Sequence, residues 1–127
     1  MREILFRGKT KTENEWVEGG IVPSFNGKHF YIGNMFVTHQ VDPETVGQYT
    51  GLTVPSGKIF EHDIVTAKFK SNGARFNFTV KYSNKKGCYV FDNGSVEVSF
   101  DDIRSVRIIG NIHDNPELLK EGVDNDL

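Results

Sequence analysis

Alternation of apolar and polar residues between Asp63 and Lys81 constrains the fold more than any other feature of the chain. Phe76, Phe78 and Val80 share one face of an extended segment, and polar residues separate them. Such a two-residue period is typical of a sheet with one buried side. Turn-forming residues follow at short intervals, at 71–73, 85–87 and 92–94. The sequence therefore predicts successive β-hairpins rather than strand–helix–strand units.

The remaining segments also favour β structure, with one helical stretch near the C-terminal end. Residues 3–7 and 16–22 flank a polar turn and predict a hairpin that Pro23 ends, because proline has no N–H to donate to a ladder. The Asn-Pro pair at 115–116 is a good helix start, so we expect a short helix over 116–120. We predict a mainly β fold: a small SH3-like or OB-like barrel with an N-terminal β-hairpin region and a short C-terminal helix. An α+β fold is the alternative.

A chain of 127 residues has the length of one domain. We expect a single domain over 1–127, with an N-terminal β region at 1–40, a barrel core at 41–113, and a short helix and tail at 114–127. Cys88 is the only cysteine, so an intramolecular disulfide is excluded, which fits a reducing cytosol. No apolar run approaches the roughly 20 residues that cross a bilayer. We therefore expect a cytoplasmic protein without a membrane partner.

Charge is distributed unevenly along the chain, although the net charge is only −2. Between Asp63 and Asp92 the sequence has no acidic residue and six cations: Lys68, Lys70, Arg75, Lys81, Lys85 and Lys86. The charged residues after Ile112 are mainly acidic: Asp114, Glu117, Glu121, Asp124 and Asp126, against Lys120 alone. A solvated hairpin face and a solvated tail explain this pattern. The alternatives are a basic patch for an acidic partner or nucleic acid, and an acidic tail of one subunit against the basic patch of another.

Aromatic residues are interleaved with these cations: Phe69, Phe76, Phe78, Tyr82 and Tyr89. Small barrels that bind single-stranded nucleic acid stack bases on exposed aromatic rings of a basic face. The simpler interpretation is that the phenylalanines fill the core, because two of them share a face with Val80. Tyr49 is a further candidate contact residue, and the alternative is that its hydroxyl bonds the backbone at a corner. The sequence leaves these possibilities open.

Catalysis has little support in the sequence. Glu61, His62 and Asp63 are residue types that ligate metals or transfer protons, but neighbouring residues on a strand point to opposite faces. We expect Asp63 or Glu61 to accept backbone N–H groups in a turn instead. His113 would complete a site only if the closing strand lay beside that turn. Cys88 falls inside a predicted strand, where we expect a small core residue. We therefore predict no catalytic residues, no cofactor and no metal site.

Three blocks of the sequence resemble the YopX-like proteins of phages and prophages in low-GC Gram-positive bacteria. The blocks begin with REILFRGK at 2–9 and EWVEG at 15–19, continue with GQYTGL at 47–52 and GKIFEHDIV at 57–65, and close with IGNIHDNPELL at 109–119. That family usually has glycine where this chain has His62. A positive φ there would strain histidine, so we expect an ordinary turn conformation.

The resemblance implies a small protein expressed inside a bacterial host, from a family without an established biochemical role. We expect a non-enzymatic phage or prophage accessory protein that acts by protein–protein contacts. It is expected to self-assemble as a homo-oligomer, with an unidentified phage or host protein as a further partner. Leu118 and Leu119 would dock either on a neighbour or on their own barrel. The alternative function is a nucleic-acid-binding small barrel that uses the basic hairpin face.

Overall fold

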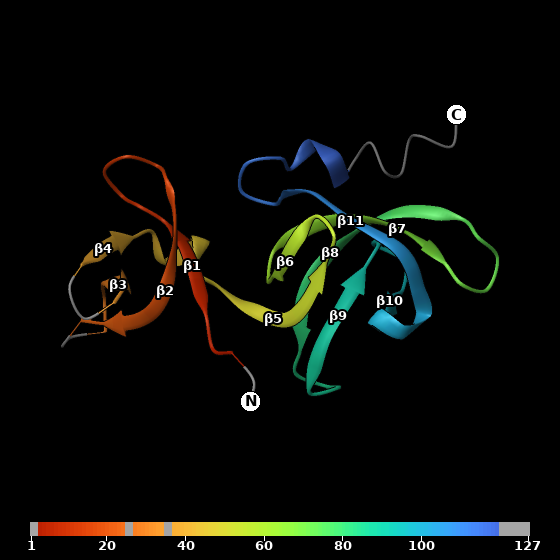
Figure 1. Ribbon diagram of the computed structural model, residues 1–127, viewed down its shortest axis with the longest axis horizontal. Coiled ribbons are helices and arrows are strands. Elements are labelled where there is room, and N and C mark those ends of the chain that lie inside the picture. Colours follow the sequence, from red (N-terminus) through yellow and green to blue (C-terminus); the bar gives the residue numbers. More distant parts are fainter. Residues whose placement is uncertain (1–2, 25–26, 35–36, 120–127) are drawn as a thin grey trace. The chain divides into compact units, whose positions relative to one another are not determined.

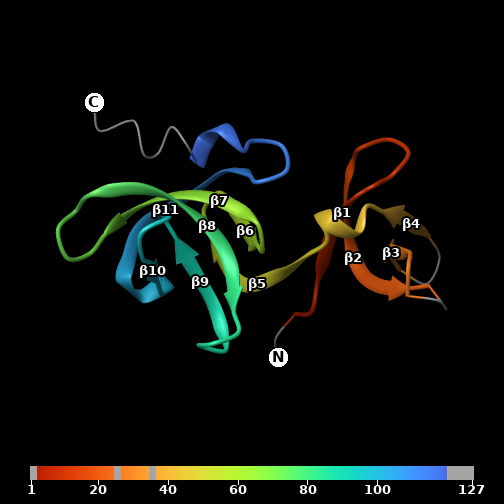
Figure 2. The same cartoon turned by 180° about the vertical axis from the view of Figure 1, so that it is seen from behind.

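The computed structural model describes residues 3–24, 27–34 and 37–119, and nearly all of its regular structure is β (Figure 1). It divides into two compact units, Met1–Gly51 and Leu52–Leu127, and the two views in Figures 1 and 2 show the strands of each unit. The expected single domain, with its segments 1–40, 41–113 and 114–127, stays a prediction.

The first unit is built on antiparallel strands in the order β4-β3-β2-β1, and β1 pairs on its other side with the start of β5. Their bounds are Phe6–Lys9 for β1, Trp16–Pro23 for β2, Phe30–Gly33 for β3, Thr38–Val41 for β4 and Gly47–Val54 for β5. As predicted, β2 ends at Pro23. Backbone hydrogen bonds from Lys11 N to Gln40 O and from Asp42 N to Lys9 O join β4 back to the end of β1.

A single 3-10 turn, η1 (Pro43–Thr45), connects β4 to β5. Asp42 precedes it, and its carboxylate accepts the N–H of Glu44 at 3.2 Å. Proline at the first position of the turn fits because that position has no N–H partner to lose. The turn returns the chain to β1, where the hydroxyl of Thr45 accepts the N–H of Lys9 at 2.8 Å.

The second unit holds β6 next to the end of β5, and a five-stranded antiparallel sheet in the order β10-β9-β8-β7-β11. The bounds are Gly57–Phe60 for β6, Asp63–Phe69 for β7, Arg75–Ser83 for β8, Cys88–Asp92 for β9, Glu97–Val98 for β10 and Ile103–Asn111 for β11. A 3-10 turn, η2 (Phe100–Asp102), precedes β11. The consecutive hairpins predicted from the turn residues are confirmed.

The apolar face of this sheet forms the core of the second unit. Val65 lies opposite Phe78 across β7 and β8, and Val80 lies opposite Phe91 across β8 and β9. All four side chains are fully buried, and Phe76 packs against the same cluster. The two-residue period therefore predicted the buried face correctly.

The mainly β class and the short C-terminal helix are confirmed. The helical turn occupies 117–119 in the described residues, and the predicted last residue, Lys120, lies outside them. Two antiparallel sheets are present, and no closed barrel is found in the part of the chain that the structure describes. Within that same part, no helix is long and apolar enough to cross a membrane.

Candidate functional site

The turn between β6 and β7 is built around a buried carboxylate. Asp63 is only 1% exposed, and its Oδ2 accepts the N–H of Phe60 at 2.7 Å. A hydrogen bond from a backbone N–H compensates part of the cost of burying a charged group. The expectation that a carboxylate of this segment stabilises the turn is confirmed for Asp63.

His62 adopts a left-handed backbone conformation, with φ 77°, so the expected ordinary turn conformation is wrong. The reason is that both of its peptide groups are fixed by neighbouring elements. Its N–H donates to Val80 O at 2.8 Å, and its carbonyl accepts the N–H of Ile112 at 3.0 Å. These two bonds hold a conformation that a non-glycine residue seldom adopts.

The closing segment of the chain lies beside this turn, which is the condition stated for His113. Asn111 on β11 pairs with Asp63 on β7, and the rings of His62 and His113 meet edge to face with centroids 5.3 Å apart. The structure thus brings together the blocks at 57–65 and 109–119. Sequence reasoning named these residues but had no signal for their pairing, because about 50 residues separate them along the chain.

Side-chain oxygens at the end of β11 also bond the backbone. Asn111 Oδ1 accepts the N–H groups of His113 and Asp114 at 3.0 and 2.9 Å, and Asn115 Oδ1 accepts the N–H of Asn111 at 3.3 Å. A Cβ on Gly110 would overlap the Asn115 side chain, so this position requires glycine. No group of three or more His, Cys, Asp or Glu residues suited to hold a metal ion is found among the described residues.

Lys81 is engaged in ion pairs. Its Nζ lies 2.8 Å from Asp92 Oδ2 and 2.9 Å from Glu97 Oε2. These hydrogen bonds, that to Asp92 first, raise the pKa of Lys81 above its usual range. Burial is the largest single effect and acts to raise the pKa of Asp92, but the hydrogen bonds from Lys81 and from the Gly94 N–H, together with the charge of Lys81, hold that pKa below its ordinary value. Lys81 is therefore already neutralised within its own sheet.

The six predicted cations do not form one patch. Arg75 begins β8, whereas Lys85 and Lys86 lie in the turn after its last residue, Ser83. At about 3.4 Å per residue, the two ends of β8 are roughly 27 Å apart. With Lys81 paired between them, the predicted basic hairpin face is corrected to two separate cationic ends.

One of these ends is larger than the sequence indicated, because β11 adds cations to it. Lys68 on β7 lies directly opposite Arg75 on β8 and Arg104 on β11, and Arg107 lies opposite Thr66 in the next register position. We call Lys68, Arg75, Arg104 and Arg107 the cationic row. Figure 2 shows its three strands within the same sheet. Arg104 and Arg107 were missed because the pairing of β11 with β7 joins residues more than 35 positions apart.

The other predicted contact residues are less available than expected. Tyr49 is only 6% exposed, so its side chain offers almost no surface to a partner. Phe69 and Phe76 pack against the buried core cluster, and Phe78 belongs to it. Leu118 and Leu119 are half-buried, and the Leu118 carbonyl accepts a hydrogen bond from Asn77 Nδ2 at 3.0 Å, so this turn docks on its own sheet.

Two residues at the Lys85 end of β8 and β9 are exposed, Tyr82 and Cys88. Tyr82 is 44% exposed and meets Tyr89 edge to face, with ring centroids 5.2 Å apart. Cys88 is exposed, so the expectation of a small core residue is wrong. It occupies the first position of β9, beyond the buried part of the strand, and strand periodicity alone does not show where burial stops.

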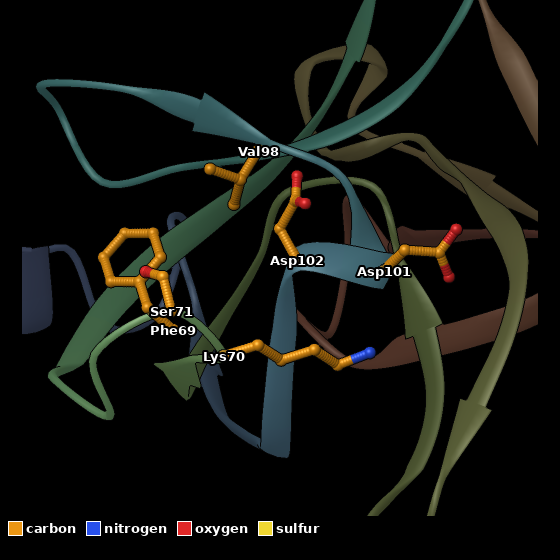
Figure 3. Close-up of a pocket in the computed structure, with 6 residues that line it drawn as sticks. All are labelled: Phe69, Lys70, Ser71, Val98, Asp101 and Asp102. Carbon is orange, nitrogen blue, oxygen red and sulfur yellow. The ribbon is translucent and has the colours of Figure 1, made fainter.

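A shallow pocket of about 550 Å³ lies beside the cationic row, between the turn after β7 and η2. It is lined by Phe69, Lys70, Ser71, Val98, Asp101 and Asp102, and Figure 3 shows the Phe69 ring and the Lys70 side chain extending to opposite sides. The Asp102 carboxylate accepts hydrogen bonds from N and Oγ of Ser99, both at 3.1 Å, and so closes η2. The pocket gathers charges of both signs and none of the residues first considered for catalysis.

Comparisons with known proteins place the chain in a family. A family model described as YopX protein matches residues 5–120, which covers most of each compact unit. The chain belongs to the YopX family. A similar solved structure, protein EF1440 from Enterococcus faecalis, shares 24% sequence identity with this YopX family member at a TM-score of 0.56. The likeness covers 94% of this chain and 99% of that one, and supports the fold. No curated protein matches the chain.

Proposed function

We propose that this chain is a non-enzymatic phage or prophage accessory protein that works inside a bacterial host by binding other macromolecules. The observation that carries the proposal is that polar side chains in the blocks at 57–65 and 109–119 form hydrogen bonds to the backbone. Asp63, Asn111 and Asn115 bond the backbone groups that build two adjoining turns. Groups committed to turns in this way support a structural role for the segments that the family resemblance picks out.

A hydrolase built on Glu61, His62, Asp63 and His113 is the enzymatic alternative. The histidine rings do meet, but the carboxylate of Asp63 is buried and accepts the Phe60 N–H. A general acid–base pair needs its groups within hydrogen-bond reach of a substrate. The buried position of Asp63 argues against that use, so we favour a binding function.

Self-association is the contact that we favour, and charge segregation within the second unit supports it. The cationic row lies on β7, β8 and β11, and the exposed carboxylate of Glu117 lies on the helical turn that docks at Asn77. The sequence after this turn adds Glu121, Asp124 and Asp126, which lie outside the described residues. In a two-fold symmetric dimer, each acidic segment meets the partner's row, so a single arrangement forms both contacts.

Light scattering after size-exclusion chromatography tests this proposal at 50 and 500 mM NaCl. We expect a dimer at low salt and a shift toward monomer at high salt, because ions screen contacts between exposed charges. Reversing the row (Arg104→Glu with Arg107→Glu) or the acidic segment (Glu117→Lys with Glu121→Lys) is expected to give monomers. Mixing the two variants restores complementary charges and should give a heterodimer.

The matched control reverses two exposed lysines outside the row, Lys85→Glu with Lys86→Glu, and should remain dimeric. A wild-type chain that stays monomeric at 50 mM salt and about 50 μM protein would overturn self-association. Equal loss of dimer in the control would place the contact elsewhere on the molecule.

A further inference from the structure

The cationic row has a regular geometry. In an antiparallel sheet, directly opposite residues project from the same face, so Arg104, Lys68 and Arg75 stand side by side across three strands. Strands lie about 4.8 Å apart, so the three Cα atoms span roughly 10 Å. Arg107 extends the row along β11, next to Thr66.

The part of the chain that the structure describes offers these charges no carboxylate partner. Among the described residues, no ion pair joins Lys68, Arg75, Arg104 or Arg107 to an acidic side chain, in contrast to Lys81 with its two carboxylates. Like charges directly opposite each other destabilise a sheet. A bound polyanion would relieve that repulsion, so the row has the electrostatics of an anion-binding surface.

Part of the row is held in place before any ligand binds. Arg75 Nη1 donates to the Thr66 hydroxyl at 3.2 Å, and the Arg104 guanidinium lies against Gly73 in the turn between β7 and β8. Thr66 is buried, so its hydroxyl is a fixed acceptor. An arginine that is already oriented loses less conformational freedom when it binds.

We propose that the cationic row binds the phosphate backbone of duplex nucleic acid without reading its sequence. Three of its four members are arginines, whose planar guanidinium matches a phosphate with two parallel hydrogen bonds. Phosphates repeat regularly, about every 3.4 Å of helix axis on each nucleic-acid strand. The cations of the row also recur at a regular spacing, about 4.8 Å from one β-strand to the next. Carboxylates on an acidic protein have no such repeat, so nucleic acid is the better match.

The position of the aromatic side chains favours duplex over single-stranded ligands. Phe76 and Phe78 face the core, on the opposite side of β8 from Arg75. A surface that holds single strands by stacking needs exposed rings next to its cations. The row can contact the phosphate backbone of nucleic acid, but its own members include no aromatic ring on which a base could stack. We therefore expect neither a base preference nor a preference for single strands.

Fluorescence anisotropy with a labelled 20-base-pair DNA duplex tests the proposal over 25–200 mM NaCl. Four phosphate contacts predict a slope of about −3.6 for log K against log salt, so binding weakens roughly 150-fold between 50 and 200 mM. The substitutions Arg104→Gln and Arg107→Gln should each reduce the slope by about one and weaken binding equally for unrelated sequences. Circular dichroism confirms that each variant is folded.

The matched control is Lys85→Gln with Lys86→Gln, which removes two charges at the far end of β8 and should leave the slope unchanged. Absence of binding at 25 mM salt, by the wild-type chain and by the Glu117→Lys with Glu121→Lys variant alike, would overturn the proposal. Equal weakening by the control, or saturable binding of a poly-glutamate peptide with no binding of the duplex, would overturn it as well.

This inference uses the same face as the proposed dimer but does not depend on the dimer. The variant Glu117→Lys with Glu121→Lys should lose self-association and bind the duplex at least as well as the wild-type chain. A monomeric wild-type chain that binds the duplex would therefore contradict the dimer alone. A dimeric wild-type chain whose monomeric Glu117→Lys with Glu121→Lys variant also fails to bind the duplex would contradict the nucleic-acid inference alone.

Discussion

His62 shows how a single residue can be held in an unfavourable conformation by its surroundings. Its N–H is bonded to the carbonyl of Val80 on β8, and its carbonyl to the N–H of Ile112, the residue after β11. A left-handed backbone costs a non-glycine residue about 1–2 kcal/mol. The two hydrogen bonds offset this cost, and they connect the turn after β6 to β8 and to the end of β11.

Two substitutions at this position separate the backbone from the ring. His62→Ala and His62→Gly both remove the contact with His113, but only glycine relieves the positive φ. We expect the glycine variant to be more stable than the alanine variant by about 1 kcal/mol. Urea unfolding of both variants measures the difference, and an alanine variant as stable as the glycine variant would contradict strain at this turn.

The structure requires glycine at Gly110, because the Asn115 side chain occupies the space of a Cβ. Gly110→Ala should displace Asn115 from the Asn111 N–H and lower the free energy of unfolding by about 1–3 kcal/mol. In a chain that already carries Asn115→Ala, the same change should cost clearly less. A thermal or urea unfolding cycle of the four proteins measures this coupling, and additive effects would contradict it.

At the scale of elements, β10 has few backbone hydrogen bonds to hold it, since it has two residues and lies at the edge of its sheet. Lys81 on β8 reaches both Asp92 on β9 and Glu97 on β10. It thereby connects three neighbouring strands, on the side of the sheet opposite to Val80 and Phe91. Exposed pairs contribute little each, but a shared cation links strands that are otherwise joined only by a short ladder.

The lowered pKa of Asp92 gives this cluster a defined pH dependence. Its folded pKa lies below the unfolded value of about 3.9, so its contribution to stability is present above that value and is lost as pH falls through the folded pKa. We expect Lys81→Gln to destabilise the protein at pH 7, with a difference from wild type that shrinks toward pH 2.5. Urea unfolding across this pH range measures it; a constant difference would contradict the assignment.

The sequence predicted the strands themselves but not which strands pair with one another. The alternation in β7 and β8 and the Gly-containing turns reflect local chemistry, so the strands and the buried face of Phe78 were predictable. The pairing of Lys68 with Arg104 and of Asp63 with Asn111 depends on which strands meet, which no local pattern records. The cationic row and the ion pairs of Lys81 with Asp92 and Glu97 could therefore not be predicted from the sequence. The φ of His62 was missed because two long-range hydrogen bonds determine it.

At the scale of the whole molecule, each compact unit has buried residues of its own. Ile32, Val41 and Tyr49 are buried in the first, whereas Phe78, Val80 and their neighbours form the core of the second. A unit with its own core can lose stability without the same loss elsewhere. Measurements on the full chain should therefore resolve the two units.

The single tryptophan, Trp16, allows this to be tested, because it lies in the first unit. Phe78→Ala should destabilise the second unit by about 3–5 kcal/mol. We expect the urea midpoint seen by a fluorophore on Cys88 to fall, while the midpoint seen by Trp16 fluorescence changes little. Coincident shifts of both signals would contradict separate unfolding of the units.

The hydrogen bond between Asn77 and the Leu118 carbonyl determines where the polypeptide leaves its sheet. Asn77 and Arg75 project from the same side of β8, about 7 Å apart along the strand. The described helical turn at 117–119 is therefore held next to a positively charged side chain of β8. A label coupled within this turn would meet that charge, so an anionic dye would be drawn onto the sheet and a cationic one would be repelled.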